Sequence, residues 1–147
     1  MTDTSLGRVL RQMFACDQSW DNSDIANVYA DPKQGLLSWA ALKPELLVVE
    51  GAVVLGPMTD EQLLNLENQI KKNPGRVDLS SYRWLEVPYQ FEDRSSLSEE
   101  QELVLAQVFA EAWLMHLKAR FPDQSWRTRV IPPSETGSVV GVSFANT

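Results

Sequence analysis

The chain has 147 residues, a length that suits one domain able to bury a core without metal ions or disulfides. An apolar fraction of 44% with 22% charged residues is typical of a soluble globular protein, and five tryptophans argue against disorder. The net charge of −7 disfavours nucleic-acid binding through a basic patch. We therefore expect one globular domain over residues 1–147 that does not bind nucleic acid.

The acidic residues are concentrated in the first half of the chain. Through Ile70 there are 4 basic and 10 acidic residues, a net of −6, and from Lys71 there are 9 and 10, a net of −1. The lone Cys16 cannot form an internal disulfide, which favours a reducing, cytoplasmic location. No signal peptide or clean membrane span is visible, so we expect no membrane partner.

The N-terminal segment predicts helices. An amphipathic helix capped by Asp3 or Thr4 follows from apolar residues spaced i, i+3, i+4, i+7 and i+8: Leu6, Val9, Leu10, Met13 and Phe14. Two shorter helices are expected, one from Ser23 or Asp24 to Tyr29 and one over 35–42.

The β-branched run 46–55 predicts either one long strand or a hairpin that turns at Glu50-Gly51. We favour the hairpin because Gly supplies the positive φ of a two-residue turn. A helix follows, opened by the capping box of Thr59 and Gln62 and ended near Lys72.

Residues 84–91 alternate between apolar and polar side chains, which predicts a strand. Pro88 cannot donate a ladder hydrogen bond, so this strand should lie at a sheet edge or carry a bulge.

The segment 97–120 has the strongest helix signal in the chain. Overlapping capping boxes begin at Ser96 and Ser98, and acidic residues fill the first turn. Its polar residues form one narrow stripe: Glu100, Gln107, Glu111 and Lys118. Since its middle is apolar almost all round, we expect a central core helix, with the functional surface elsewhere on the molecule.

The chain ends with two alternating segments, around 126–130 and 140–144, joined by the turn-forming run 132–137. Strands and helices do not alternate as in parallel βαβ units. We therefore predict an α+β fold, with a mostly antiparallel sheet of about four to five strands against the long helix, plus N-terminal helices.

Motifs for catalysis and cofactors are scarce. One Cys and one His cannot supply a zinc site, so we expect neither metal nor cofactor. The segment from Asp17 to Asp21 resembles the start of a calcium loop, but Asn22 and Val28 replace the required Gly and Glu. His116 lies near Arg120, which would lower its pKa, and we interpret it as structural. The sequence favours a protein that is not an enzyme.

One set of charged residues could bind a ligand. Arg127 and Arg129 share one face of a strand, and Arg83, Glu86 and Arg94 lie in or beside another. If these strands are neighbours, the sheet face could hold a carboxylate or phosphate. The alternative interpretation is the ordinary charged outer face of a half-covered sheet.

We therefore predict a small acidic protein that acts by binding another protein, with immunity or toxin-neutralising proteins and adaptors as possible classes. Its acidic N-terminal half would favour a basic partner, through four aspartates: Asp17, Asp21, Asp24 and Asp31. A binder of small anions or a modest enzyme using the arginine face is the alternative. A homo-oligomer is a third reading, suggested by the tryptophans and the edge strand.

Overall fold

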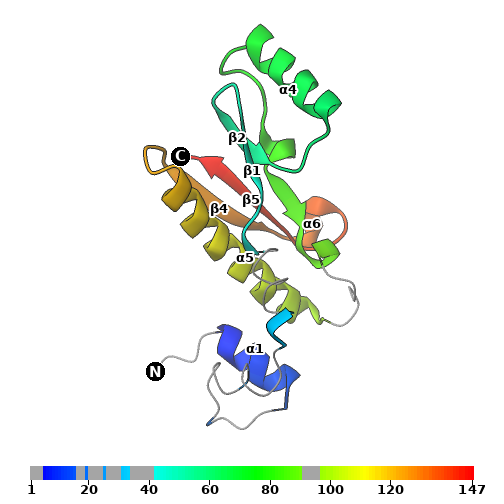
Figure 1. Ribbon diagram of the computed structural model, residues 1–147. Helices are drawn as coiled ribbons and strands as arrows, with labels where there is room; N and C mark the ends of the chain where they lie inside the picture. Colours follow the sequence, from blue (N-terminus) through cyan, green and yellow to red (C-terminus); the bar gives the residue numbers. More distant parts are fainter. Residues whose placement is uncertain (1–4, 16–18, 20–24, 26–30, 34–41, 91–96) are drawn as a thin grey trace.

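The computed structural model describes residues 5–15, 19, 25, 31–33, 42–90 and 97–147. Figure 1 shows α1 and α4 near opposite ends of the molecule, with α5 and the strands between them. The elements follow one another in this order: α1 Ser5–Met13, β1 Leu46–Val49, β2 Ala52–Leu55, α4 Asp60–Lys72, η1 Ser80–Tyr82, β3 Trp84–Glu86, η2 Val87–Gln90, α5 Glu99–Arg120, β4 Trp126–Ile131, α6 Pro133–Thr136 and β5 Gly141–Asn146.

Helix α5 is the central element of the fold, as predicted. Ser98 is its N-cap, and the capping box with Gln101 is formed in both directions. The expected polar stripe is exposed, while the opposite side supplies buried core residues: Val104, Ala106, Phe109, Ala110, Trp113 and Leu117. Helix α1 packs against the beginning of α5, where Arg8 bonds to Glu100 at 2.6 Å.

Strands β3, β5 and β4 form an antiparallel sheet in that order, so β3 and β4 are its two edges. Cross-strand partners share a face, and the face with Val130, Val142 and Leu85 packs on α5 and the core. The hydroxyl of Thr128 donates to the carbonyl of Ala110 in α5 at 2.8 Å. The predicted α+β architecture, with a long helix packed on an antiparallel sheet, is confirmed.

The hairpin interpretation of residues 46–55 is confirmed. Strands β1 and β2 pair antiparallel, and the turn residues Glu50 and Gly51 have φ of 47° and 80°. Both residues of this turn type need positive φ, which Gly adopts without steric cost. The hairpin forms a second, two-stranded sheet, so the five strands described are divided between two sheets rather than joined in one.

Helix α4 packs on this hairpin. Its capping box of Thr59 and Gln62 is formed as predicted. The ammonium group of Lys71 forms an ion pair with Glu67, one turn earlier in α4. Its Nζ also lies 3.4 Å from Oε1 of the hairpin residue Glu50. A small separate core fills the space between them, made of Val49, Val54 and Leu66 with half-buried neighbours.

The structure corrects three expectations. The strand predicted over 84–91 ends at Glu86 and continues as the 3₁₀ helix η2. Val87 still donates to the carbonyl of Val140, and the ladder stops there because β5 begins at Gly141, opposite Glu86. The edge position predicted from Pro88 is correct. The run 132–137 contains a short helix, α6, besides its turn.

The third correction concerns the middle of α5, which the sequence predicts to be buried almost all round: Leu103 in this region is 39% exposed. Several other predictions fall outside the described residues: the caps Asp3 and Thr4, the box at Ser96, and nearly all of the two short helices expected between 23 and 42. Within the described part of the chain, no helix is long and apolar enough to cross a membrane.

Candidate functional site

The outer face of the three-stranded sheet carries the predicted arginines. Arg129 pairs with Ser143 of β5, which pairs in turn with Trp84 of β3, and Arg127 pairs with Ala145. Paired residues point to the same side, so these side chains all lie on the face away from α5. Both arginines are exposed. The sequence therefore correctly placed Arg127 and Arg129 together.

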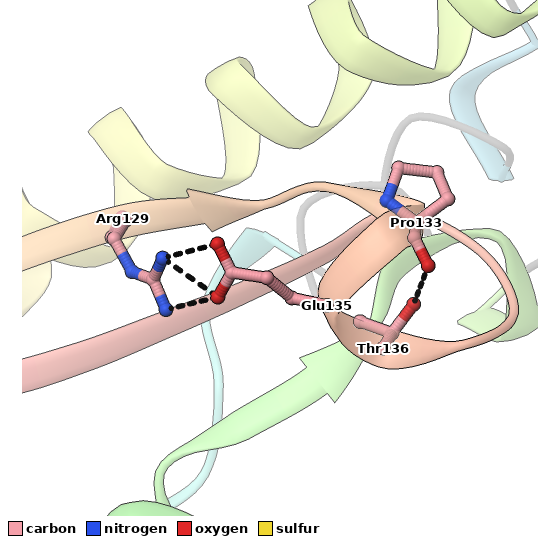
Figure 2. A network of polar contacts seen from close by, with 4 residues as sticks. All are labelled: Arg129, Pro133, Glu135 and Thr136. Atoms are coloured by element: carbon pink, nitrogen blue, oxygen red, sulfur yellow. Dashed lines mark hydrogen bonds and ion pairs between the residues drawn. The ribbon is translucent and has the colours of Figure 1, made fainter.

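Arg129 already holds a carboxylate of the same chain. Figure 2 shows Glu135 of α6 meeting its guanidinium through three contacts of 2.9–3.0 Å. The hydroxyl of Thr136 donates to the carbonyls of Pro133 and Val139, at 3.3 and 2.6 Å, which fixes the turn that carries Glu135. Because the two side chains are 58% and 49% exposed, such a pair contributes only about 0 to 1 kcal/mol. Another carboxylate could therefore replace Glu135 at Arg129 at a small cost in free energy.

Arg83 turns its guanidinium to the covered side of the sheet, although the residue also lines the groove on the outer face. Its Nε donates to the carbonyl of Val53 at 2.8 Å, and its guanidinium carbon lies 5.4 Å from the Phe144 ring and 5.9 Å from the Trp126 ring. Those rings belong to the covered side of the sheet. Arg83 is only 7% exposed, and burial lowers its pKa from the ordinary value. It fastens the hairpin to the three-stranded sheet.

Glu86 lies on β3, at the opposite edge of the sheet from the arginines of β4, with β5 between them. The charged-face hypothesis required these two strands to be neighbours, and they are not. Arg94, the remaining member of that set, lies outside the described residues. Of the five predicted residues, Arg127 and Arg129 share the outer face of β4, and Arg83 lines the same groove.

A groove of about 600 Å³ runs over the outer face, where β5 carries only the small residues Ser143 and Ala145. Its far rim is the segment 77–80, which leads into η1 and β3. There Asp78 accepts from the Ser80 N–H at 2.9 Å, and bonds from the Ser80 backbone and hydroxyl lower the pKa of this carboxyl. Three arginines, Arg83, Arg127 and Arg129, line the groove with one acid, Asp78, and Glu135 pairs with Arg129 beside it.

The free edge of β4 is the feature that the sequence did not reveal. The N–H of Phe144 donates to the carbonyl of Arg83, next to β3, and the N–H of Thr147 donates to the carbonyl of Ser125, next to β4. The backbone groups of even-numbered β5 residues therefore point toward β3, and those of odd-numbered residues point toward β4. Since Thr128 pairs with Phe144 and Val130 with Val142, the backbone N–H and C=O groups of Thr128 and Val130 point away from β5. Among the described residues, no strand pairs with this edge.

A groove of about 440 Å³ with both apolar and polar walls lies beside this edge, between β4 and α5. Its lining consists of Leu103, Gln107, Ala110, Glu111, Leu114, Thr128 and Val130. Leu103 lies beside the polar stripe of α5, where a large apolar side chain would be partly exposed. That position is the sequence signal that could have indicated the groove. Small Ala110 leaves the space, and the bond from Thr128 to its carbonyl holds α5 against β4.

The other candidate residues remain apart from this site. Asp31 is exposed and accepts from the Lys33 N–H at 2.7 Å, while Asp17, Asp21 and Asp24 lie outside the described residues.

The pKa of His116 is lowered by burial first and then by Lys43 and Arg120, in the predicted direction.

The part of the chain that the structure describes contains no cluster of three His, Cys, Asp or Glu side chains able to hold a metal ion. The protein matches no known protein-family model, curated protein or solved structure.

Proposed function

We propose that the protein is a binding module that takes an extended segment of another protein as an added strand along β4. The observation that carries this proposal is the open edge of β4, whose Thr128 and Val130 present backbone donors and acceptors beside the groove between β4 and α5. Strand addition of this kind obtains affinity from main-chain hydrogen bonds and specificity from pockets for alternate side chains.

The groove distinguishes this edge from an ordinary one. Arginines on an edge strand can simply prevent unwanted pairing, and Arg127 and Arg129 serve that purpose whether or not a partner exists. Protection does not require an apolar wall, however. Leu103 is 39% exposed and Leu114 is half-buried, and both line the groove next to the open edge. Each main-chain bond to a partner would contribute about 0.5 to 1.5 kcal/mol, and burial of the leucines would add to it.

The two other candidate functions receive less support. A free anionic ligand would have to displace Glu135 from Arg129 without the main-chain hydrogen bonds that an added strand gains along β4. A basic partner drawn to the aspartates of the first half stays a prediction, since three of those four residues lie outside the described part. A role as an immunity or toxin-neutralising protein is one form that segment binding could take.

Proline substitution at the edge tests the proposal. Val130→Pro removes an outward N–H of β4 without removing a bond to β5, and prolines are tolerated at sheet edges. The matched control is Val48→Pro. Val48 pairs with Val53 between the bonded positions of the hairpin, so its N–H also points out of an edge strand, and its side chain is 56% exposed.

A displayed library of random nine-residue peptides would be panned against the wild type and both variants, after circular dichroism has shown that each is folded. We expect peptides enriched on the wild type to bind Val48→Pro equally and to lose at least about tenfold in affinity on Val130→Pro, the loss of one or two main-chain bonds. Equal binding to all three proteins would refute strand addition at β4.

A further inference from the structure

An added strand would present its side chains to β4 in a fixed way. Thr128 and Val130 bond outward, so residues of the partner opposite them form hydrogen-bonded pairs and point into the groove beside α5. Residues opposite Arg127 and Arg129 form the closer, non-hydrogen-bonded pairs, with Cα atoms about 4.5 Å apart. These two partner positions are separated by one residue, and both lie on the outer face.

The charges on that outer face favour carboxylates at these two positions. The side chain of Arg127 has no hydrogen-bond or ion-pair partner within the described ranges of the chain. Arg129 has Glu135, through an exposed pair that contributes only about 0 to 1 kcal/mol. A partner carboxylate can therefore replace Glu135 at little cost, whereas a partner lysine would face two guanidinium groups. Asp78 lines the outer groove as well, and its carboxyl accepts from the Ser80 N–H.

The groove side of the partner strand faces different chemistry. Gln107 and Glu111 line this side of the edge along with three apolar residues, Leu103, Leu114 and Val130. Apolar partner side chains at the intervening positions would contact these three, and the Glu111 carboxylate disfavours acidic ones there. The two faces of β4 together select a strand that alternates acidic and apolar residues.

The two registers that would overlap a second copy of β4 most fully oppose like charges. Two β4 strands that pair antiparallel with their outer faces on one side align odd-numbered residues with odd-numbered ones. In a register centred on Thr128, Arg127 of each copy would lie opposite Arg129 of the other, and a register centred on Arg129 sets two copies of Arg129 opposite each other. Like charges directly opposite are destabilising, which favours a different chain with carboxylates at these positions.

We infer that β4 recognises an extended segment with alternating acidic and apolar residues, whose carboxylates bind Arg127 and Arg129 while Glu135 releases Arg129. This inference rests on the proposed strand addition. The net charge of −7 opposes an acidic partner at long range, but most of it lies before Lys71, and the region from Lys71 onward has a net of −1. Contact with the two arginines therefore decides the preference.

Two substitutions with opposite expected effects test the inference. A single peptide clone enriched on the wild type would be labelled and titrated by fluorescence anisotropy. Arg127→Gln should weaken its binding about 5- to 10-fold, the size of one charge-assisted contact. Glu135→Gln should strengthen binding about 2- to 5-fold, because Arg129 is released from its internal partner.

Two exposed residues far from the edge provide controls of matched charge. Arg76→Gln and Glu61→Gln change the net charge by the same amounts and should leave the affinity unchanged within twofold. Enriched peptides should carry Asp or Glu at alternate positions on the wild type and lose this preference on a variant that combines Arg127→Gln with Arg129→Gln.

The outcomes separate this inference from the function on which it rests. Peptides without alternating acids, or an affinity unchanged by Arg127→Gln but lost with Val130→Pro, would overturn the acidic preference and leave strand addition standing. Weaker binding to Glu135→Gln would overturn the displacement of Glu135. Binding that Val130→Pro does not reduce would overturn both proposals.

Discussion

Trp113 offers the most direct test of the core. Its side chain is fully buried in α5, and its ring meets that of Phe144 edge-to-face, with centroids 6.1 Å apart and an interplanar angle of 74°. Its Nε1–H is also buried and has no acceptor in the part of the chain that the structure describes. The residue therefore combines a large apolar contribution with an unpaired donor that opposes it.

The two effects can be estimated separately. Burial of about 200 Å² contributes about 5 kcal/mol at 25 cal/mol per Å², and the contact with Phe144 adds about 1 kcal/mol. The unpaired N–H costs about 1 to 3 kcal/mol. Trp113→Ala should then lower the free energy of unfolding by about 3 to 5 kcal/mol. Trp113→Phe retains most of the apolar contact and removes the unpaired donor, so it should cost less than about 1.5 kcal/mol.

Urea unfolding followed by far-ultraviolet circular dichroism measures both changes without depending on tryptophan emission. Met115→Ala is the control, since this side chain of the same helix is 73% exposed and its loss should change the stability by less than about 0.5 kcal/mol. A near-neutral Trp113→Ala would mean that α5 is not the core helix. A Trp113→Phe variant as unstable as Trp113→Ala would mean that Nε1–H has an acceptor in the folded protein.

Three further predictions test the turn, the link between sheet and helix, and the histidine. Gly51→Ala should cost about 1 to 2 kcal/mol in urea unfolding, because φ of 80° is strained for Ala and no neighbouring atom adds a clash; no loss would contradict this turn geometry. Thr128→Val should cost about 1 kcal/mol by removing the bond to Ala110, and an unchanged stability would mean that this bond is not formed in solution. The single histidine, His116, should titrate below 6.5 in proton NMR, because burial, Lys43 and Arg120 disfavour its charged form. Its contribution to stability is therefore complete above pH 6.5 and is lost as the pH falls through the folded pKa; a pKa at or above 6.5 would refute this.

The fold was largely predictable because its elements carry local signals. The capping boxes at Ser98 and Thr59 fix the starts of α5 and α4 without information from the rest of the chain. The Glu50-Gly51 turn is encoded by one glycine. The end of β3 depends on where the neighbouring strand β5 begins. Because β5 begins at Gly141, opposite Glu86, the strand pairing does not extend to Pro88.

The candidate site was less predictable because it depends on strand order. Arg127 and Arg129 were placed on one face by simple alternation, which holds for any neighbour. The Arg83 guanidinium lies against Phe144 and Trp126 on the covered side of the sheet, although the residue lines the same groove as Arg127 and Arg129. A charged residue next to a strand indicates an exposed face only when the register is known. The open edge of β4 follows from β5 being the middle strand, and no local pattern encodes that order.

The position of Leu103 connects the fold to the proposed function. Sequence reasoning treated α5 as purely structural and expected the functional surface elsewhere, because its apolar residues exceeded what one face can hold. In the structure, one of these additional apolar residues, Leu103, is partly exposed and lines the groove beside β4. A helix buried between two layers would need no such residue. The same helix therefore supplies the core through Trp113 and one wall of the proposed binding groove through Leu103 and Leu114, while β4 supplies the hydrogen-bonding edge.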